Sequence, residues 1–217
     1  MIINQIVSGG SSPAPTEKYP IGQILYENNE YKGIVYGHFT DENNNKYALI
    51  LELYRSTDYN EVIPKTYSGL YCSGSISGTG VTSTENNALF KDYETATTKC
   101  NAIIDYCTTN NYTSVVQDIR QESITLDGVT YYGQMPTVNE YLEMLSHSRE
   151  VAAVADQQPV SGTGAWNLAK YWSMHLSSNR VSSYPWCVGS TQTASAIYRP
   201  SASTSASTYV IFEVPIN

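Results

Sequence analysis

Alternating and periodic apolar positions divide the chain into a strand-rich first part, a helical middle and a second strand-rich part. Apolar and aromatic runs at 23–26, 31–39 and 46–54 predict three strands, and the polar residues 41–45 form a turn between the last two. Strands this closely spaced pair with their neighbours, so we expect an antiparallel meander. The Gly-, Ser- and Thr-rich stretch 68–87 predicts a long loop that is functional or covered by a partner.

Two helices are expected in the middle of the chain. Small and apolar side chains at helical spacing predict the first over about residues 92–108. The second has an explicit start. The Thr137 hydroxyl can accept from the amide of Glu140, and the Glu140 carboxylate can accept from the amide of Thr137. This helix should run to about residue 148, with a continuation to residue 155 left open.

The remaining pattern is β and loop. Asp127-Gly128 is a strong hairpin signal and predicts paired strands at 123–126 and 129–132. Four further strand-like runs follow at 171–174, 185–188, 194–199 and 208–214. The last of these is apolar enough to be a central strand. Together with the helices, this order predicts an α+β fold class.

The first 19 residues have the composition of a flexible arm, and the globular domain should span 20–217. Gly, Ser and Pro dominate residues 9–15. Four apolar residues precede that stretch: Ile2, Ile3, Ile6 and Val7. They could add a strand to a neighbouring subunit or simply fray. We expect them to pack on another subunit, which gives a homo-oligomer, with a trimer favoured.

Composition and charge narrow the possible partners. The 217 residues carry a net charge of −8 and only 12 Lys and Arg, which are scattered. A nucleic-acid surface needs clustered basic residues, and an anionic membrane surface needs the same, so both are unlikely partners. No apolar stretch approaches the roughly 20 residues of a membrane span. The first 15 residues lack a basic region and an apolar core, so no Sec signal is seen. The location expected is a virion or a cell surface.

The cysteines form no C-x-x-C pair, which argues against a zinc ribbon or a redox motif. Cys100 and Cys107 are seven residues apart in a predicted helix, share one face, and should be buried as small apolar side chains. A disulfide involving Cys72 and Cys187 is left open.

Two motifs in a fixed order carry a resemblance to a known family. The stretch MPTVNEYL at 135–142 starts a capped helix, and YWSM at 171–174 starts a strand. In this order they resemble bacterial and phage domains of C-type-lectin-like fold, in the branch related to the formylglycine-generating enzyme. The resemblance covers about residues 20–217. It implies two helices packed on a twisted antiparallel sheet with long loops, and a ligand face built by the C-terminal strands and loops.

Members of that family suggest what the chain does. Several are phage receptor-binding or surface proteins, and some are variable proteins of diversity-generating retroelements. The oxidase members use a pair of C-terminal cysteines, whereas this chain has only Cys187 there. That activity should therefore be absent.

Other catalytic and metal-binding patterns are missing. The histidines are His38, His147 and His175, and none lies in an H-E-x-x-H motif. A triad of Ser, His175 and an Asp is left open, because triads are defined by geometry. The nearest approaches to a calcium-lectin motif, at 158–160 and 166–168, lack the carboxylate or amide ligand that calcium needs. We expect no enzyme, no cofactor and no metal.

The residues left for function resemble those of a binding surface. Tyr, Trp and Arg provide rigid contact area, and Ser and Asn provide adaptable hydrogen bonds. Trp172 and Trp186 should be core residues beneath this surface. The predicted ligand-binding residues are His175, Ser177, Asn179, Arg180, Ser183, Tyr184, Tyr198 and Arg199. The sequence thus predicts a non-enzymatic domain that binds a protein or glycan receptor. The alternative is a structural virion or assembly protein without an exposed receptor site.

Overall fold

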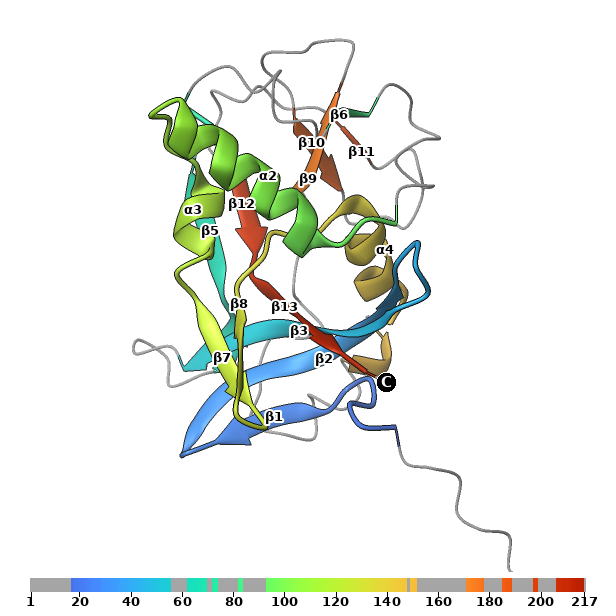
Figure 1. The fold of residues 1–217 in the computed structure, drawn as a ribbon. Coiled ribbons are helices and arrows are strands. Elements are labelled where there is room, and N and C mark those ends of the chain that lie inside the picture. The colour runs from blue at the N-terminus through green and yellow to red at the C-terminus, as the bar shows by residue number, and fades with distance from the viewer. Residues whose placement is uncertain are drawn as a thin grey trace, which may run out of the picture.

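The computed structural model of the protein describes residues 17–55, 62–69, 72–73, 82–83, 93–147, 149–151, 171–177, 185–188, 197–198 and 206–216. Helices occupy the middle of the described chain, and strands precede and follow them (Figure 1). Most strand pairs are antiparallel. The fold is therefore α+β, as the sequence predicts.

The first sheet is the predicted meander, closed at one edge by the end of the chain. Its strands in order are β1 (Ile24–Glu27), β2 (Glu30–Thr40), β3 (Lys46–Arg55) and β13 (Ile211–Pro215), and β4 (Val62–Pro64) also pairs with β3. The β1–β2 turn places Asn28 and Asn29 at positive φ, 53° and 63°. Asparagine tolerates that conformation, which matches the twist of a hairpin. In the β2–β3 turn, Asp41 Oδ1 accepts from the amides of Asn43 and Asn45 at 2.9 Å.

Helices cover both faces of this sheet. They are α2 (Ala96–Thr109), α3 (Val115–Ile119) and α4 (Val138–Ser146). Along β3, Ala48 and Ile50 belong to the core shared with α2 and α3, while Leu49 and Leu51 belong to the core shared with α4. All four are fully buried. Consecutive side chains of a strand point to opposite faces, so an uninterrupted apolar run is what a sheet covered on both sides requires.

The start of α4 and the hairpin lie where the sequence predicts them. The Glu140 amide donates to Thr137 Oγ1 at 3.2 Å, and the Thr137 amide donates to Glu140 Oε2 at 2.7 Å, which completes the capping box. The hairpin strands are β7 (Ser123–Leu126) and β8 (Val129–Tyr132). Asp127 and Gly128 between them both have positive φ. Local capping and turn chemistry therefore fix both features.

Other predicted boundaries were wrong. Helix α2 begins at Ala96, with Thr95 as its N-cap, and not near residue 92. Helix α4 ends at Ser146, two residues before the predicted end. The sequence analysis missed α3, whose Ser114 cap also forms a capping box. A helix of five residues is too short to produce a visible period.

A second sheet gathers the C-terminal strands. Its strands in order are β11 (Ile197–Tyr198), β10 (Pro185–Val188), β9 (Tyr171–Ser177), β12 (Ala206–Tyr209) and β5 (Thr66–Gly69), and β6 (Thr82–Ser83) pairs with β9. The pairs β9–β12 and β6–β9 are parallel, so this sheet is mixed and not purely antiparallel. Part of the predicted 68–87 loop thus contributes strand residues.

The predicted last strand is two strands in two sheets. β12 belongs to the second sheet and β13 to the first, with Val210 between them (Figure 1). The expectation of a central strand is confirmed for β12, which lies between β9 and β5, and was wrong for β13, which ends the strand order of the first sheet. Residues 211–214 are nevertheless buried, since the core lies on both faces of β13. The apolar pattern therefore indicates that the residues are buried. It does not indicate whether the strand lies at the edge or in the middle of the sheet.

Two further observations bear on the sequence analysis. Cys100 and Cys107 are fully buried, as predicted, and the Cys72 and Cys107 sulfurs lie 3.5 Å apart as free thiols. Among the helices of the described residues, none is long and apolar enough to cross a membrane.

Candidate functional site

The second sheet carries the described part of the predicted binding residues. His175 and Ser177 lie on β9 and Tyr198 lies on β11. Strand β10 pairs with both strands, and in the backbone register its Cys187 is paired with Trp172 of β9 on one side and with Tyr198 of β11 on the other. The remaining predicted residues, Asn179, Arg180, Ser183, Tyr184 and Arg199, lie outside the described residues. The backbone therefore brings the two described segments of the predicted face into one sheet, on the two strands that flank β10.

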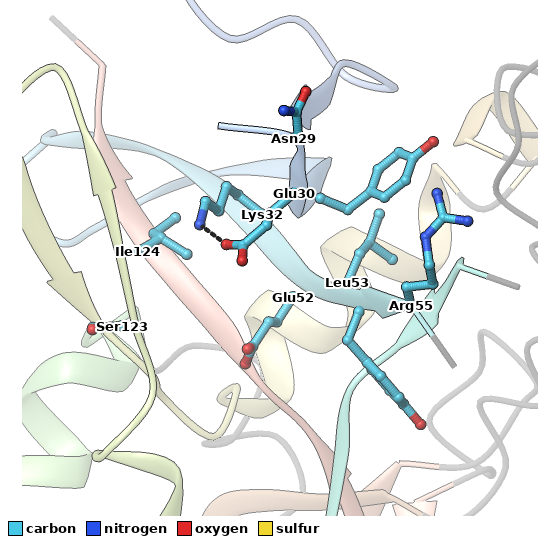
Figure 2. Close-up of a pocket in the computed structure, with 10 residues that line it drawn as sticks. Asn29, Glu30, Lys32, Glu52, Leu53, Arg55, Ser123 and Ile124 are labelled. Atoms are coloured by element: carbon cyan, nitrogen blue, oxygen red, sulfur yellow. Dashed lines mark hydrogen bonds and ion pairs between the residues drawn. The ribbon is translucent and has the colours of Figure 1, made fainter. Parts of the chain in front are cut away.

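A pocket that the sequence analysis did not predict lies at the edge of the first sheet. It has a volume of about 470 Å³ and is lined by residues 29–32, 52–55 and 123–124. The β1–β2 turn, the end of β3 and the start of β7 supply these segments. In Figure 2, Ile124 lies on one side and Arg55 on the other, with the ion pair of Lys32 and Glu30 between them. The size falls in the range of about 300–1,000 Å³ that is typical of small-molecule sites.

Aromatic and charged side chains form the open part of this pocket. Tyr54 is 42% exposed, and the Arg55 guanidinium lies 5.8 Å from the centroid of the Tyr31 ring. The Lys32 ammonium lies 2.7 Å from Glu30 Oε2. One cation–π contact and one ion pair thus hold the charged side chains next to exposed aromatic surface.

A charged cluster adjoins the pocket through Glu52. The Lys65 ammonium lies 3.3 Å from Glu52 Oε1 and 2.5 Å from Glu122 Oε2. The Tyr67 hydroxyl donates to Glu122 Oε1. The side chain of Glu52 is only 12% exposed, and its second oxygen, Oε2, is buried with no hydrogen-bond partner. One ammonium therefore serves two carboxyl groups, and one of those groups is incompletely satisfied.

Burial and neighbouring charges separate the pKa values of the two acids. Burial raises the pKa of Glu52 to about 7, and the nearby Glu122 adds to the rise while Lys65 opposes it. Burial alone would raise the pKa of Glu122 as well. Hydrogen bonds from Lys65 and Tyr67 outweigh that effect and lower it. Near neutral pH, Glu122 is therefore the anion and Glu52 is close to half protonated.

The cluster sits where the two sheets meet. The amide of Glu52 donates to the carbonyl of Val210 at 3.0 Å, and the amide of Lys65 donates to the carbonyl of Glu52 at 2.9 Å. Val210 is the residue between β12 and β13, and Tyr67 belongs to β5 of the second sheet. The backbone bonds thus fix the Glu52 side chain at the joint between the sheets.

A second pair of buried acids occupies the start of α2. Glu213 accepts from the amides of Ala96 and Thr97, each at 2.8 Å, and from the Thr97 hydroxyl. Glu140 Oε1 accepts from the Ala96 amide at 3.0 Å. Burial, with the nearby Glu213, raises the pKa of Glu140 well above its usual value. Free amides of a helix N-terminus bond both acids, so this pair stabilises the fold, although Glu213 also lines a pocket of about 420 Å³.

The sequence contained a signal for these acids. Glu52 and Glu213 each interrupt an apolar strand, in LILEL and IFEVP. A carboxylate in such a run must find a partner or a cavity, because an unpaired buried charge is costly. The partners of Glu52 and Glu213 are distant in sequence. The apolar runs therefore identify the two acids but do not identify the residues that bond to them.

The side chains of His38 and His147 have acidic or carbonyl partners. His38 lies 2.7 Å from the Tyr19 carbonyl and 3.1 Å from Glu17, and His147 lies between Glu143 and Glu150. These contacts are typical of histidines that are structural or solvated. Within the described part of the chain, no three His, Cys, Asp or Glu side chains are grouped to hold a metal ion.

Comparison with known proteins gives no match. No family model fits the chain, and no curated protein or solved structure is significantly similar to it. The functional assignment therefore rests on the residues and their geometry.

Proposed function

We propose that the chain is a non-enzymatic ligand-binding domain of C-type-lectin-like fold, from a phage or bacterial surface protein. It binds a protein or glycan receptor through the C-terminal strands β9, β10 and β11 and their loops. The observation that carries this proposal is the pairing of β10 with both β9 and β11. Strands β9 and β11, which carry two segments of the predicted face, thereby flank β10 in one sheet, although about twenty residues separate them in sequence.

The arrangement of helices supports the fold in this proposal. The resemblance implies two helices against a twisted antiparallel sheet, and α2 and α4 pack on opposite faces of the first sheet. It also implies a ligand face from the C-terminal strands, and those strands supply most of the second sheet. Assignment to the C-type-lectin-like class remains part of the proposal.

The described side chains favour binding over catalysis. The rings of His38 and His147 contact carboxylates or a carbonyl, and neither contacts a Ser or Cys nucleophile among the described residues. The thiols of Cys100 and Cys107 are buried, and burial raises the pKa of each to about 12. A thiol with such a pKa is not a nucleophile near neutral pH.

A double substitution tests the binding face. We expect Arg180→Ala/Tyr184→Ala to reduce adsorption to bacterial cells, or to a glycan and protein array, because large side chains dominate binding energy. Each truncation should cost on the order of 2 kcal/mol of binding free energy. The matched control is Tyr132→Ala/Arg149→Ala, which removes the same chemistry at exposed positions that are not part of any strand of the second sheet. It should bind like the wild type.

The same experiment separates the two candidate functions. Equal binding by the wild type and a folded Arg180→Ala/Tyr184→Ala variant excludes this face. That result favours the alternative, a structural virion or assembly protein without an exposed receptor site.

The proposal includes a homo-oligomer formed through the N-terminal apolar residues, which lie outside the described residues. Sedimentation velocity of the full chain beside a version starting at Lys18 tests it. We expect an oligomer, with a trimer favoured, for the full chain and a smaller species for the shortened one. If both sediment as monomers, the first residues do not mediate assembly.

A further inference from the structure

Two buried cysteines lie next to each other in the core, although they are far apart in the sequence. The sulfurs of Cys72 and Cys107 are 3.5 Å apart, and the residues are 35 positions apart along the chain. Cys72 is 5% exposed and Cys107 is fully buried, and both belong to the core that the first sheet shares with α2 and α3. Neither lies on β9, β10 or β11, so this pair is independent of the proposed receptor face.

Backbone hydrogen bonds hold the two cysteines in this position. The Ser73 amide donates to the Thr113 carbonyl at 2.8 Å, and the Thr113 amide donates to Ser73 Oγ at 2.8 Å. The Tyr112 amide donates to the Cys107 carbonyl at 2.8 Å, which joins this segment to the end of α2. The residue after Cys72 is thus bonded to the segment that follows α2, and the fold itself keeps the two sulfurs close.

The separation of the sulfurs is close to what a disulfide requires. Sulfur atoms at 3.5 Å need to approach by about 1.5 Å to reach the bond length of about 2.05 Å. We propose that Cys72 and Cys107 form a disulfide in oxidising surroundings, so that the pair is a site of covalent modification by thiol–disulfide exchange. Cys72 then pairs with Cys107 and not with Cys187, the pairing that the sequence left open. Oxidising surroundings are found outside the cytosol, on virion and cell surfaces among others.

A small disulfide such as oxidised glutathione supplies the oxidant for this reaction. The thiolate of one cysteine attacks a glutathione sulfur, which forms a mixed disulfide and releases one glutathione thiolate. The thiolate of the other cysteine then attacks the first cysteine's sulfur, forms the Cys72–Cys107 bond and releases the second glutathione thiolate. Two protein thiols are oxidised, one glutathione disulfide is reduced to two thiols, and the two protons pass from the cysteines to glutathione.

Burial determines when the exchange occurs. Burial raises the pKa of Cys107 to about 12, with a contribution from Cys72, so the thiolate that exchange needs is scarce in the folded protein. In the unfolded chain a cysteine is accessible and has a pKa of about 8.5. The bond therefore forms while the chain folds or opens, and the packed core then protects it from reduction.

The test incubates the full chain with oxidised and reduced glutathione, in buffer and in urea at the midpoint of unfolding. Free thiols are then alkylated, and mass spectrometry of non-reduced proteolytic peptides identifies the linked cysteines. We expect a Cys72–Cys107 linkage that forms about tenfold faster, or more, in urea than in buffer. Linkage of Cys72 to Cys187, or the absence of any linkage, would overturn the proposal.

The melting temperature gives a second readout with a matched control. Dithiothreitol should lower the melting temperature of the oxidised wild type by about 5 °C or more, because the bond closes a long loop. Cys72→Ala and Cys100→Ala each remove one buried thiol from the same core. Dithiothreitol should lower the melting temperature of Cys100→Ala as in the wild type and leave that of Cys72→Ala unchanged. The comparison is made within each variant, so the cost of the substitution itself cancels. An equal response of the two variants would contradict the pairing.

Discussion

The fold contains two close pairs of glutamates, one buried (Glu140 and Glu213) and one partly buried (Glu52 and Glu122), and their hydrogen-bond partners differ. Glu140 and Glu213 face the free amides at the start of α2, which donate at 2.8–3.0 Å. Glu52 and Glu122 share the ammonium of Lys65, and Glu52 keeps one buried oxygen without a partner beside an open pocket. The first pair is enclosed by backbone amides, although Glu213 also lines a pocket of about 420 Å³, whereas the second pair leaves one oxygen without a hydrogen-bond partner.

The difference shows how to interpret a buried acid. Where backbone amides supply the hydrogen bonds, the carboxyl group replaces missing helix bonds and its role is structural. Where the acid is incompletely satisfied and lines a cavity, its protonation can change within the folded state. Burial alone does not distinguish these cases, because both pairs raise the pKa of one member.

The largest effect should follow from Glu213→Ala. This change removes the acceptor for the Thr97 amide and hydroxyl and one acceptor for the Ala96 amide. We expect a loss of about 3 kcal/mol in the free energy of unfolding, measured with urea. The exposed Glu30→Ala serves as control and should match the wild type within error. A Glu213→Ala variant as stable as the wild type would contradict a structural role for the enclosed pair.

The second effect concerns pH and Glu52. The unfolded chain releases this proton near 4.5 and the folded protein near 7, so the folded state binds more protons between these values. The free energy of unfolding therefore falls as the pH rises through that window. Lys65 and Tyr67 stay protonated there, because the pKa of each is raised from a value of 10 or more. The pKa of Glu122 is lowered, so its contribution is lost only below the window.

Glu52→Gln removes this dependence. Relative to the wild type, the variant should gain on the order of 2 kcal/mol in the free energy of unfolding between about pH 5 and about pH 8. Urea unfolding of both proteins across the range measures the difference, and contributions from Glu140 cancel in it. A difference that does not vary with pH would mean that Glu52 has an ordinary pKa.

A smaller effect is expected at the cap that positions Glu140. Thr137→Ala removes the acceptor for the Glu140 amide, which lies 3.2 Å from Thr137 Oγ1, and should cost roughly 1 kcal/mol. Thermal and urea unfolding measure it. Thr125→Ala, at an exposed position of β7 where the hydroxyl meets that of Thr130, is the control. A loss at Thr137 no larger than at Thr125 would show that the box contributes little.

No effect is expected from chelation. If either glutamate pair held calcium, EDTA would lower the melting temperature. We expect the temperature to stay unchanged, because hydrogen-bond donors (amides, hydroxyl groups and an ammonium) surround these carboxyl groups and, among the described residues, no further carboxylate ligands are grouped there for calcium. A fall of several degrees that calcium reverses would contradict this.

Local chemistry explains which elements could be predicted. The β1–β3 meander, the Asp127-Gly128 hairpin and the Thr137 cap depend on neighbouring residues. The start of α2 does not. Its Ala96 amide is bonded by carboxylates 44 and 117 residues further along the chain, and these set the first turn. Propensity near residue 92 carried no information about them.

The candidate site also has one part that local sequence predicts and another that it does not. The C-terminal strands could be predicted from their apolar and aromatic runs, although the break at Val210 could not, since the residues there are apolar in both sheets. The pocket was missed because Tyr31, Tyr54 and Ile124 each fit their own strand pattern. Only the packing of the β7–β8 hairpin brings them to one cavity.

The contrast between the two glutamate pairs depends most directly on the protonation of Glu52. Carbon-13 NMR of the glutamate side-chain carboxyl groups, with the resonance assigned by Glu52→Gln, follows it in the folded protein. A midpoint near pH 7 for Glu52 is the result expected from its burial and its contact with Glu122. A midpoint near 4.5, the usual value for a glutamate, would contradict the account.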